Sequence, residues 1–276
     1  MEKAIVTQID STTWQFTEQL LGEKVYCYLL VGAERALLID TAYGFTDIAG
    51  AIRSITALPL LVVNTHGHFD HITGNYRFGA AYLSKKDREL YQRHTQLVSL
   101  EETLAYIAGG GLKGKAAVLA LRPKFKRMLA HEIPDPIPLP DCGFFELGNR
   151  KVEILETPGH TTGSISLLDT KNGWLFSGDT CGDEGMLLHF PEATSVRSFH
   201  QTIREISKLA TKGKIIRNYP SHQTSPAPLE KLAFYDRLLE RLEAGCLSEK
   251  EWKACAVNED SITIRFDPKR VKEETA

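Results

Sequence analysis

The feature that most constrains the fold is a cluster of metal-binding side chains directly after a short apolar run. Residues 65–71 read Thr-His-Gly-His-Phe-Asp-His and follow the β-prone run Leu60–Val63. His66 and His68 are two positions apart, so at the end of an extended strand both imidazoles leave on the same side and can bind one ion. We interpret the motif as a metal site in the loop at the carboxyl end of a strand, where α/β proteins usually place ligands.

The rest of the motif supplies a second pair of candidate ligands. Asp70 and His71 come after Gly67, and a chain that turns there can direct them at a second ion nearby. Imidazole and carboxylate groups suit zinc, iron or manganese. Since no cysteine lies near the motif, it does not fit the closed, cysteine-rich sites of structural zinc. The sequence therefore predicts a metal centre that a substrate can reach.

Composition narrows the classes of partner. The formal net charge of −2 supplies no general attraction to nucleic acid or to anionic membranes. The five cysteines are scattered and form no CxxC pair, which is typical of a reducing compartment. The first ten residues do not resemble a signal peptide, and no apolar run is long enough to span a membrane. We expect a cytoplasmic protein with a small-molecule substrate and with neither a nucleic-acid nor a membrane partner.

Short β-prone runs and amphipathic stretches alternate along the chain. The expected strands are 25–31, 36–39, 60–63, 144–147, 152–155, 165–168, 174–177, 214–219 and 262–266. The expected helices are 46–56, capped by Thr46; 84–96, opened by Ser84 and Asp87 as a capping box; 198–210; and 228–244. This order gives two similar halves, which predicts an α/β protein with two sheets packed face to face and helices outside. We expect a single domain over residues 1–276.

Residues 97–131 break this rhythm, and a helical insertion is predicted at about 85–131. Glycines 109–111 precede a stretch with one apolar helical stripe, formed by Val118, Leu121, Phe125 and Met128. Between residues 103 and 130 there is no acidic residue, and the six basic ones are Lys113, Lys115, Arg122, Lys124, Lys126 and Arg127. A solvated helix face is the ordinary explanation. The alternative is that about 97–131 form a lid that guides an anionic substrate, or a surface that docks a partner.

Three further polar residues follow predicted strands in the second half of the chain. His160 lies in the loop Thr-Pro-Gly-His-Thr-Thr-Gly-Ser at 157–164, where proline and glycine favour a tight turn. Asp179 lies in Ser-Gly-Asp-Thr at 177–180, and His222 follows the strand that ends near Pro220. A core histidine or a turn aspartate would explain any one of them, but four strand ends with such side chains can converge on one cleft.

Together these motifs resemble the metallo-β-lactamase fold superfamily of metallohydrolases. The resemblance rests on HxHxDH, TPGHTxGS, SGDT and a late histidine, and it runs from about Val25 to His222. It implies a four-layer αβ/βα sandwich with an active site along one edge, and two divalent ions, with zinc the first choice and iron or manganese the alternatives. The implied ligands are His66, His68 and His160 for one ion, Asp70, His71 and His222 for the other, and Asp179 as the bridge. Asp40 matches a position that supports a ligand through a hydrogen bond.

This ligand set implies hydrolysis by a hydroxide that bridges the two ions, without a serine or cysteine nucleophile. Asp70 and Asp179 are the candidate catalytic carboxylates, and Asp70 is suited to carry a proton to the leaving group. The candidate pocket residues are Cys181, His189 and Tyr219. Each also has an ordinary interpretation as a buried or half-buried residue, and for Cys181 a small buried side chain is favoured because the ligand set is already full.

Within the superfamily we expect a dinuclear zinc hydrolase that acts on a small ester, thioester or lactone. A β-lactamase is disfavoured because such enzymes generally lack an aspartate in the bridging position, and residues 218–224 differ from the usual sequence of glyoxalase II. Acyl-homoserine lactonases share the ligand pattern. The alternatives are an iron-dependent redox enzyme similar to sulfur dioxygenases, then a phosphodiesterase, and last a binding protein without catalysis.

Overall fold

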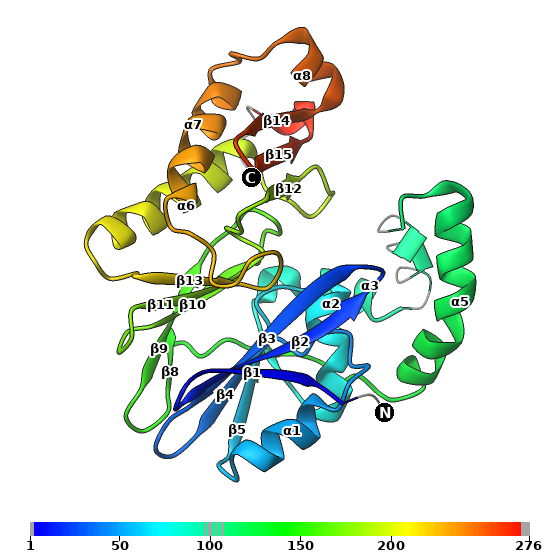
Figure 1. Ribbon diagram of the computed structural model, residues 1–276, viewed down its shortest axis with the longest axis vertical. Helices are drawn as coiled ribbons and strands as arrows, with labels where there is room; N and C mark the ends of the chain where they lie inside the picture. Colours follow the sequence, from blue (N-terminus) through cyan, green and yellow to red (C-terminus); the bar gives the residue numbers. More distant parts are fainter. Residues whose placement is uncertain (1–2, 97, 99–100, 103, 106–107, 272–276) are drawn as a thin grey trace. The chain divides into compact units, whose positions relative to one another are not determined.

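The computed structural model describes residues 3–96, 98, 101–102, 104–105 and 108–271 (Figure 1). Contacts divide the chain into two compact units, Met1–Leu139 and Pro140–Ala276. Each unit has a main β-sheet with helices packed against it, so the α/β class predicted from the sequence is confirmed. A sheet with helices is also what each half of an αβ/βα sandwich consists of. The expectation of a single domain stays a prediction.

The first unit has one seven-stranded sheet whose strands follow one another in chain order. They are β1 (Ile5–Asp10), β2 (Thr13–Leu20), β3 (Glu23–Val31), β4 (Ala36–Ile39), β5 (Leu60–Val63), β6 (Tyr82–Leu83) and β7 (Ile137–Pro138). Strands β1 to β4 pair antiparallel, whereas β4 to β7 are parallel. Because β4 and β5 are parallel neighbours, the residues after both strands lie at the same edge of the sheet. This topology brings Asp40 beside the 65–71 motif.

The helices of the first unit are α1 (Ile48–Ile55), α2 (Phe69–Ile72), α3 (Arg88–His94) and α5 (Gly111–Leu129), with short 3-10 turns at Thr73–Arg77 and Lys85–Asp87. Ile52, Phe69 and Phe125 from three of these helices share one apolar core with the sheet. On α5, Phe125 and Met128 are buried while Val118 and Leu121 pack at the edge of this core, as the predicted stripe requires. Residues 97, 99–100, 103 and 106–107 of the predicted insertion lie outside the described residues.

Two predicted helix starts are wrong, and in both cases a distant partner is the reason. Helix α1 is capped by Asp47, whose carboxylate accepts from Gly50 N. Thr46 instead donates its amide and its hydroxyl to buried Glu18, both at 2.6 Å. Ser84 caps the 3-10 turn that precedes α3, where its side chain accepts from Lys86 N, and the carboxylate of Asp87 accepts from the distant Gly67 N.

The second unit has a five-stranded sheet in the order β13-β11-β10-β9-β8 and a small sheet in the order β12-β15-β14. The bounds are β8 (Phe144–Glu146), β9 (Lys151–Glu156), β10 (Ile165–Asp169), β11 (Trp174–Gly178), β12 (Gly185–Leu188), β13 (Arg217–Pro220), β14 (Ala256–Glu259) and β15 (Ile262–Phe266). The large sheet is antiparallel except for the parallel pair β11 and β13. That parallel pair places the residues after β11 and β13 at one edge, where Asp179 and His222 follow.

Helices α6 (Val196–Thr211), α7 (Lys231–Glu243) and α8 (Glu249–Ala254) complete the second unit, with a 3-10 turn at Pro268–Arg270. Phe199 and Ile203 on α6 share an apolar core with Leu175 of the large sheet, with Tyr235 on α7 and with Ile264 of the small sheet. Among the described residues, no helix combines the length and the apolar composition needed to cross a membrane.

Candidate metal centre

The first unit holds the 65–71 motif at the junction of an extended segment and a helix. His68 has extended backbone angles, φ −74° and ψ 148°, and α2 begins at the next residue. As expected, the rings of His66 and His68 converge, with 3.0 Å between His66 Nε2 and His68 Nδ1. Two nitrogens that each lie ~2.0–2.1 Å from one tetrahedral zinc ion would be about 3.3 Å apart. The observed spacing therefore fits two ligands of one ion.

His71 is oriented by Asp40. Its Nδ1 lies 2.8 Å from Asp40 Oδ2, and both side chains are fully buried. This contact fixes the imidazole plane and directs Nε2 away from Asp40. Nε2 lies 3.7 Å from Asp70 Oδ1, so His71 and Asp70 present a nitrogen and an oxygen at the spacing of two ligands.

Asp40 makes two further contacts with the motif. Its Oδ1 accepts from Thr65 N at 2.8 Å, and its Oδ2 accepts from Thr65 Oγ1 at 2.9 Å. Asp40 has a positive φ of 61°, a conformation that aspartate tolerates better than most residues. A buried carboxylate needs such donors to offset its lost hydration. The supporting role that the resemblance implies for Asp40 agrees with this geometry.

Asp87 and His94 of the first unit accept hydrogen bonds from backbone amides of the motif, and the sequence does not single out either one as a site residue. Asp87 Oδ2 accepts from Gly67 N at 2.9 Å, and His94 Nδ1 accepts from Phe69 N at 3.3 Å. Both lie well beyond the motif in the chain, so no local spacing pattern could have identified them.

In the second unit, Asp179 lies between two histidines. Its Oδ2 is 3.4 Å from His160 Nε2, and its Oδ1 is 3.5 Å from His222 Nε2. Each carboxylate oxygen thus faces a different imidazole, at distances typical of two ligands on one ion. Ser221 N donates to the carbonyl of Gly178 at 2.9 Å, which ties the ends of β11 and β13 together beneath this group.

The loop that carries His160 is closed by its own hydrogen bonds. Thr157 N donates to the Ser164 carbonyl at 2.9 Å, and Thr161 N donates to Ser164 Oγ at 3.1 Å. His160 Nδ1 lies 3.3 Å from the Leu187 carbonyl, which leaves Nε2 for Asp179 and a metal. A Cβ on Gly159 would come within 2.3 Å of the Phe199 ring, so the loop sits against α6 only with glycine at this position.

The pocket candidates of the second unit are largely buried. Burial raises the pKa of the Cys181 thiol to about 11, so without metal this side chain is a neutral thiol near pH 7. Asn218 Nδ2 donates to the Cys181 carbonyl at 2.6 Å, which is consistent with a packing role. Tyr219 stacks on Phe176 with ring centroids 5.4 Å apart.

His189 follows β12 and contacts Phe190, with ring centroids 4.3 Å apart. Burial, and next the charge of Arg265, lowers the pKa of His189. The imidazole is therefore neutral near pH 7. The substrate roles expected for Cys181, His189 and Tyr219 stay predictions.

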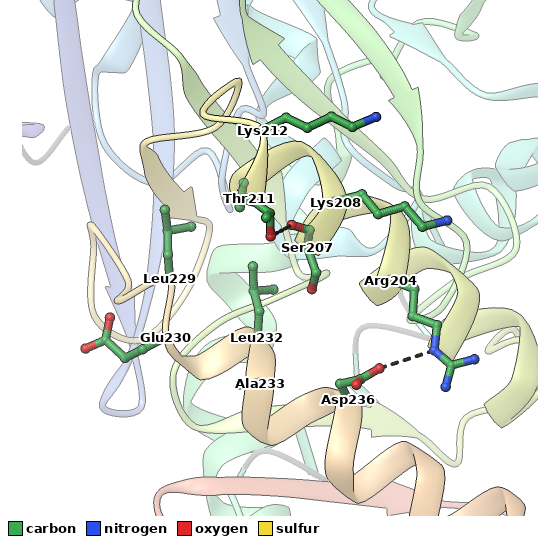
Figure 2. A pocket seen from close by; sticks show the side chains of 11 residues that line it. Arg204, Ser207, Lys208, Thr211, Lys212, Leu229, Glu230, Leu232, Ala233 and Asp236 are labelled. Carbon is green, nitrogen blue, oxygen red and sulfur yellow. Dashed lines mark hydrogen bonds and ion pairs between the residues drawn. The ribbon is translucent and has the colours of Figure 1, made fainter.

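A separate concave surface of about 570 Å³ lies between α6 and α7 (Figure 2). Arg204 and Lys208 on α6 and Lys212 directly after it extend from one side, with Leu229 just before α7 and Leu232 in its first turn. Arg204 forms an ion pair with Asp236, at 3.3 Å. The residues that line this surface include none of the predicted ligands.

A mixed α/β fold with histidine and aspartate side chains at ligand spacing in both units defines a class of metal-binding protein. Comparison with known families identifies it further: the chain belongs to the metallo-beta-lactamase superfamily, whose sequence model matches residues 21–191. The expected resemblance and fold are confirmed, and the protein is a metal-dependent hydrolase.

Several curated relatives are named hydrolases. Acyl-coenzyme A thioesterase MBLAC2 from Bos taurus is 27% identical over 215 residues, which cover 73% of this chain and 74% of that protein. The probable polyketide biosynthesis zinc-dependent hydrolase PksB from Bacillus subtilis is 24% identical over 211 residues, with 74% and 75% covered. The solved metallo-beta-lactamase from Pontibacter korlensis has a TM-score of 0.58 at 19% identity and covers 86% of this chain and 99% of its own, which shows the shared fold.

Proposed function

We propose that the protein is a dinuclear zinc hydrolase that cleaves the thioester of an acyl group on an anionic carrier such as coenzyme A. The proposal of a metal centre is carried by the position of Asp179, because its two carboxylate oxygens face two different histidines, His160 and His222. The proposal that the substrate is a thioester rests on the similarity to a thioesterase over about three quarters of both chains. Oxygen esters and lactones are the alternative substrates.

The proposed ligand assignment is the one that the sequence resemblance implies. His66, His68 and His160 would hold one ion, Asp70, His71 and His222 would hold the other, and Asp179 would bind both. The donor atoms within each unit support it, because the pair His66 and His68 and the pair His71 and Asp70 each have the spacing of two ligands. The same donors suit iron or manganese, so zinc is preferred on the name of a relative, PksB.

Two bound ions would supply a hydroxide nucleophile at neutral pH and polarise the thioester carbonyl. The protein's own residues then have defined tasks. Asp40 fixes the plane of His71, and Thr65 fixes Asp40. The carboxylate of Asp70 takes the proton that the attacking oxygen loses and passes it to the sulfur as the carbon–sulfur bond breaks. The products are a carboxylate and a free thiol.

The surface of helix α5 favours the proposal that the substrate is anionic and partly apolar. Its buried side packs next to the motif, since the rings of Phe125 and Phe69 have centroids 6.4 Å apart. Leu112 and Leu119 are seven residues apart, on one face of the helix, and are 87% and 76% exposed. Exposed Lys113 and Lys115 lie beside them. We propose that this outer face guides the charged carrier and its acyl chain, as the lid interpretation of the sequence suggests.

The test combines metal analysis with an assay for thiol release. Protein purified without added metal should contain two zinc ions per chain and should release coenzyme A from an acyl-coenzyme A. Asp179→Ala should bind less metal per chain and should lose turnover. Asp141→Ala, at an exposed aspartate of the same unit, should keep both the metal content and the turnover of the wild type. One iron per chain with oxygen consumption on a persulfide would contradict the proposal and favour the redox alternative.

All five cysteines are free thiols. Free thiols suit the reducing compartment predicted from the sequence, and a cytoplasmic location is proposed on that ground.

A further inference from the structure

The loop that carries His68 is held on both sides by one neighbouring segment of the first unit. Gly67 N, on one side of His68, donates to Asp87 Oδ2 at 2.9 Å. Phe69 N, on the other side, donates to His94 Nδ1 at 3.3 Å. Asp87 ends the 3-10 turn before α3 and His94 ends α3, so residues 85–94 provide both acceptors.

The amide of Phe69, the first residue of α2, has no acceptor within its own helix. His68 is the N-cap residue of α2, and its side chain makes no capping hydrogen bond. The first amides of a helix have no partner within the helix, and capping side chains usually fill this need. An imidazole that binds a metal through one nitrogen cannot accept from its own helix with that nitrogen. His94, at the end of α3, supplies the acceptor for Phe69 N.

His94 also contacts the ligand ring itself. The rings of His94 and His68 have centroids 5.0 Å apart and planes inclined by 30°. Because Nδ1 of His94 accepts from Phe69 N, this hydrogen bond and the contact with His68 together fix the position of the His94 ring. A fixed ring packed on His68 restricts rotation of the ligand side chain.

The approach of this segment is close at Gly67. A Cβ on Gly67 would lie 3.0 Å from Tyr91 N and 3.1 Å from the Asp87 carbonyl, so any larger residue would displace the segment or the motif. Asp87 is only 1% exposed, and a carboxylate buried to that extent depends on donors such as the Gly67 amide.

We propose that Asp87 and His94 are positioning residues that together clamp the backbone on both sides of His68 and hold its imidazole in the orientation that binds metal. We call this pair the Asp87–His94 clamp. Residues 85–94, the first part of the predicted insertion, thus support the metal centre, in addition to any role of the insertion in guiding substrate. The inference rests on the proposed function, because it takes His68 to be a ligand.

The test measures the zinc affinity of the purified protein by competition with a chelator, and the visible spectrum of the cobalt-substituted protein. His94→Ala and Asp87→Ala should each weaken zinc binding about 10- to 100-fold, the usual effect of removing a residue that supports a ligand. Asp87→Asn keeps an acceptor for Gly67 N and should restore most of the affinity. His94→Phe keeps the ring contact without the acceptor and should fall between alanine and wild type.

The control is another histidine of the same unit. His131 stacks on Tyr76 with ring centroids 4.9 Å apart, and His131→Ala should leave zinc affinity and the cobalt spectrum unchanged. The melting temperature of the metal-free variants separates support of the fold from support of the ligand. If His94→Ala and Asp87→Ala lower that temperature but bind zinc as tightly as wild type, the clamp is refuted.

A double-mutant cycle shows whether the effect passes through His68. Once His68→Ala has removed the ligand, adding His94→Ala should cause little further loss of zinc affinity, because the clamp has nothing left to orient. An equal loss in both backgrounds would overturn the clamp while leaving the proposed function intact. Unchanged zinc binding in His68→Ala alone would instead refute the proposed ligand role of His68.

Discussion

At the scale of single residues, the candidate centre depends as much on side chains that orient ligands as on the ligands. Asp40 is the clearest case, since it contacts Thr65 twice and His71 once from a backbone with positive φ. A residue in this conformation after a short strand is unusual unless it is glycine, asparagine or aspartate. The chemistry of the carboxylate and the geometry of its backbone therefore select the same residue type.

Replacing Asp40 can separate these two requirements. Asp40→Asn tolerates the positive φ but replaces one accepting oxygen with an amino group, so His71 loses its acceptor. We expect zinc affinity to fall about 10- to 100-fold, with little change in the unfolding of the metal-free protein. Asp40→Ala should add about 1–2 kcal/mol of destabilisation from the left-handed backbone. Chelator competition and urea unfolding measure the two effects, and unchanged zinc affinity in Asp40→Asn would contradict the support of His71.

At the scale of elements, the sequence predicts those strands whose buried face is apolar. The hairpin of β3 and β4, the strand β5 and the hairpin of β10 and β11 lie within one or two residues of the expected ranges. Strand β2 is not predicted, because it buries the polar residues Thr13 and Glu18 and so lacks an apolar alternation. Strand β1 is not predicted either, since it exposes Ile5 and Val6. The strands β12 and β14 and the helix α8, each six residues or fewer, are likewise absent from the expected elements.

The helix starts show a second limit of what can be predicted from the sequence. Thr46 and Asp87 have the residue types of local caps, yet each bonds to a group far away in the chain. Burial raises the pKa of Glu18, and the two donors of Thr46 partly offset this effect. A buried carboxylate competes strongly for nearby donors, and no spacing rule shows where such a carboxylate lies.

Helix α5 allows a test at this scale. Lys113→Gln with Lys115→Gln removes two exposed positive charges from its outer face. At roughly 0.2–1 kcal/mol for each exposed charge contact, the KM for acyl-coenzyme A should rise about 2- to 30-fold while kcat stays unchanged. The rise should shrink at high salt, and it should be absent for an uncharged thioester.

The matched control removes two lysines from the second unit. Lys208→Gln with Lys212→Gln alters the surface between α6 and α7 and changes the net charge by the same amount (Figure 2). An equal rise in KM for both pairs would mean that total charge, not α5, attracts the substrate. No change for either pair would remove the guiding role of α5.

At the scale of the whole molecule, the residue types of the candidate centre can be predicted from the sequence, but the residues that support it cannot. The ligands follow strands in short motifs, so spacing identifies them. Asp87 and His94 act on the motif from a segment whose packing only the folded chain reveals. The substrate is likewise set by surfaces such as α5 rather than by the ligands, which many reactions can use.

Metal removal tests the proposed ligand set in both units of the protein. A ligand that binds only the folded state stabilises it, by about 4 kcal/mol when present at a thousand times its dissociation constant. Zinc should therefore raise the melting temperature of the wild-type protein, and a chelator should reverse the rise. His66→Ala in the first unit and His222→Ala in the second should each reduce this rise, because each removes a proposed ligand. If zinc stabilised His222→Ala as much as wild type, His222 would not be a ligand, and the assignment of the second ion would have to change.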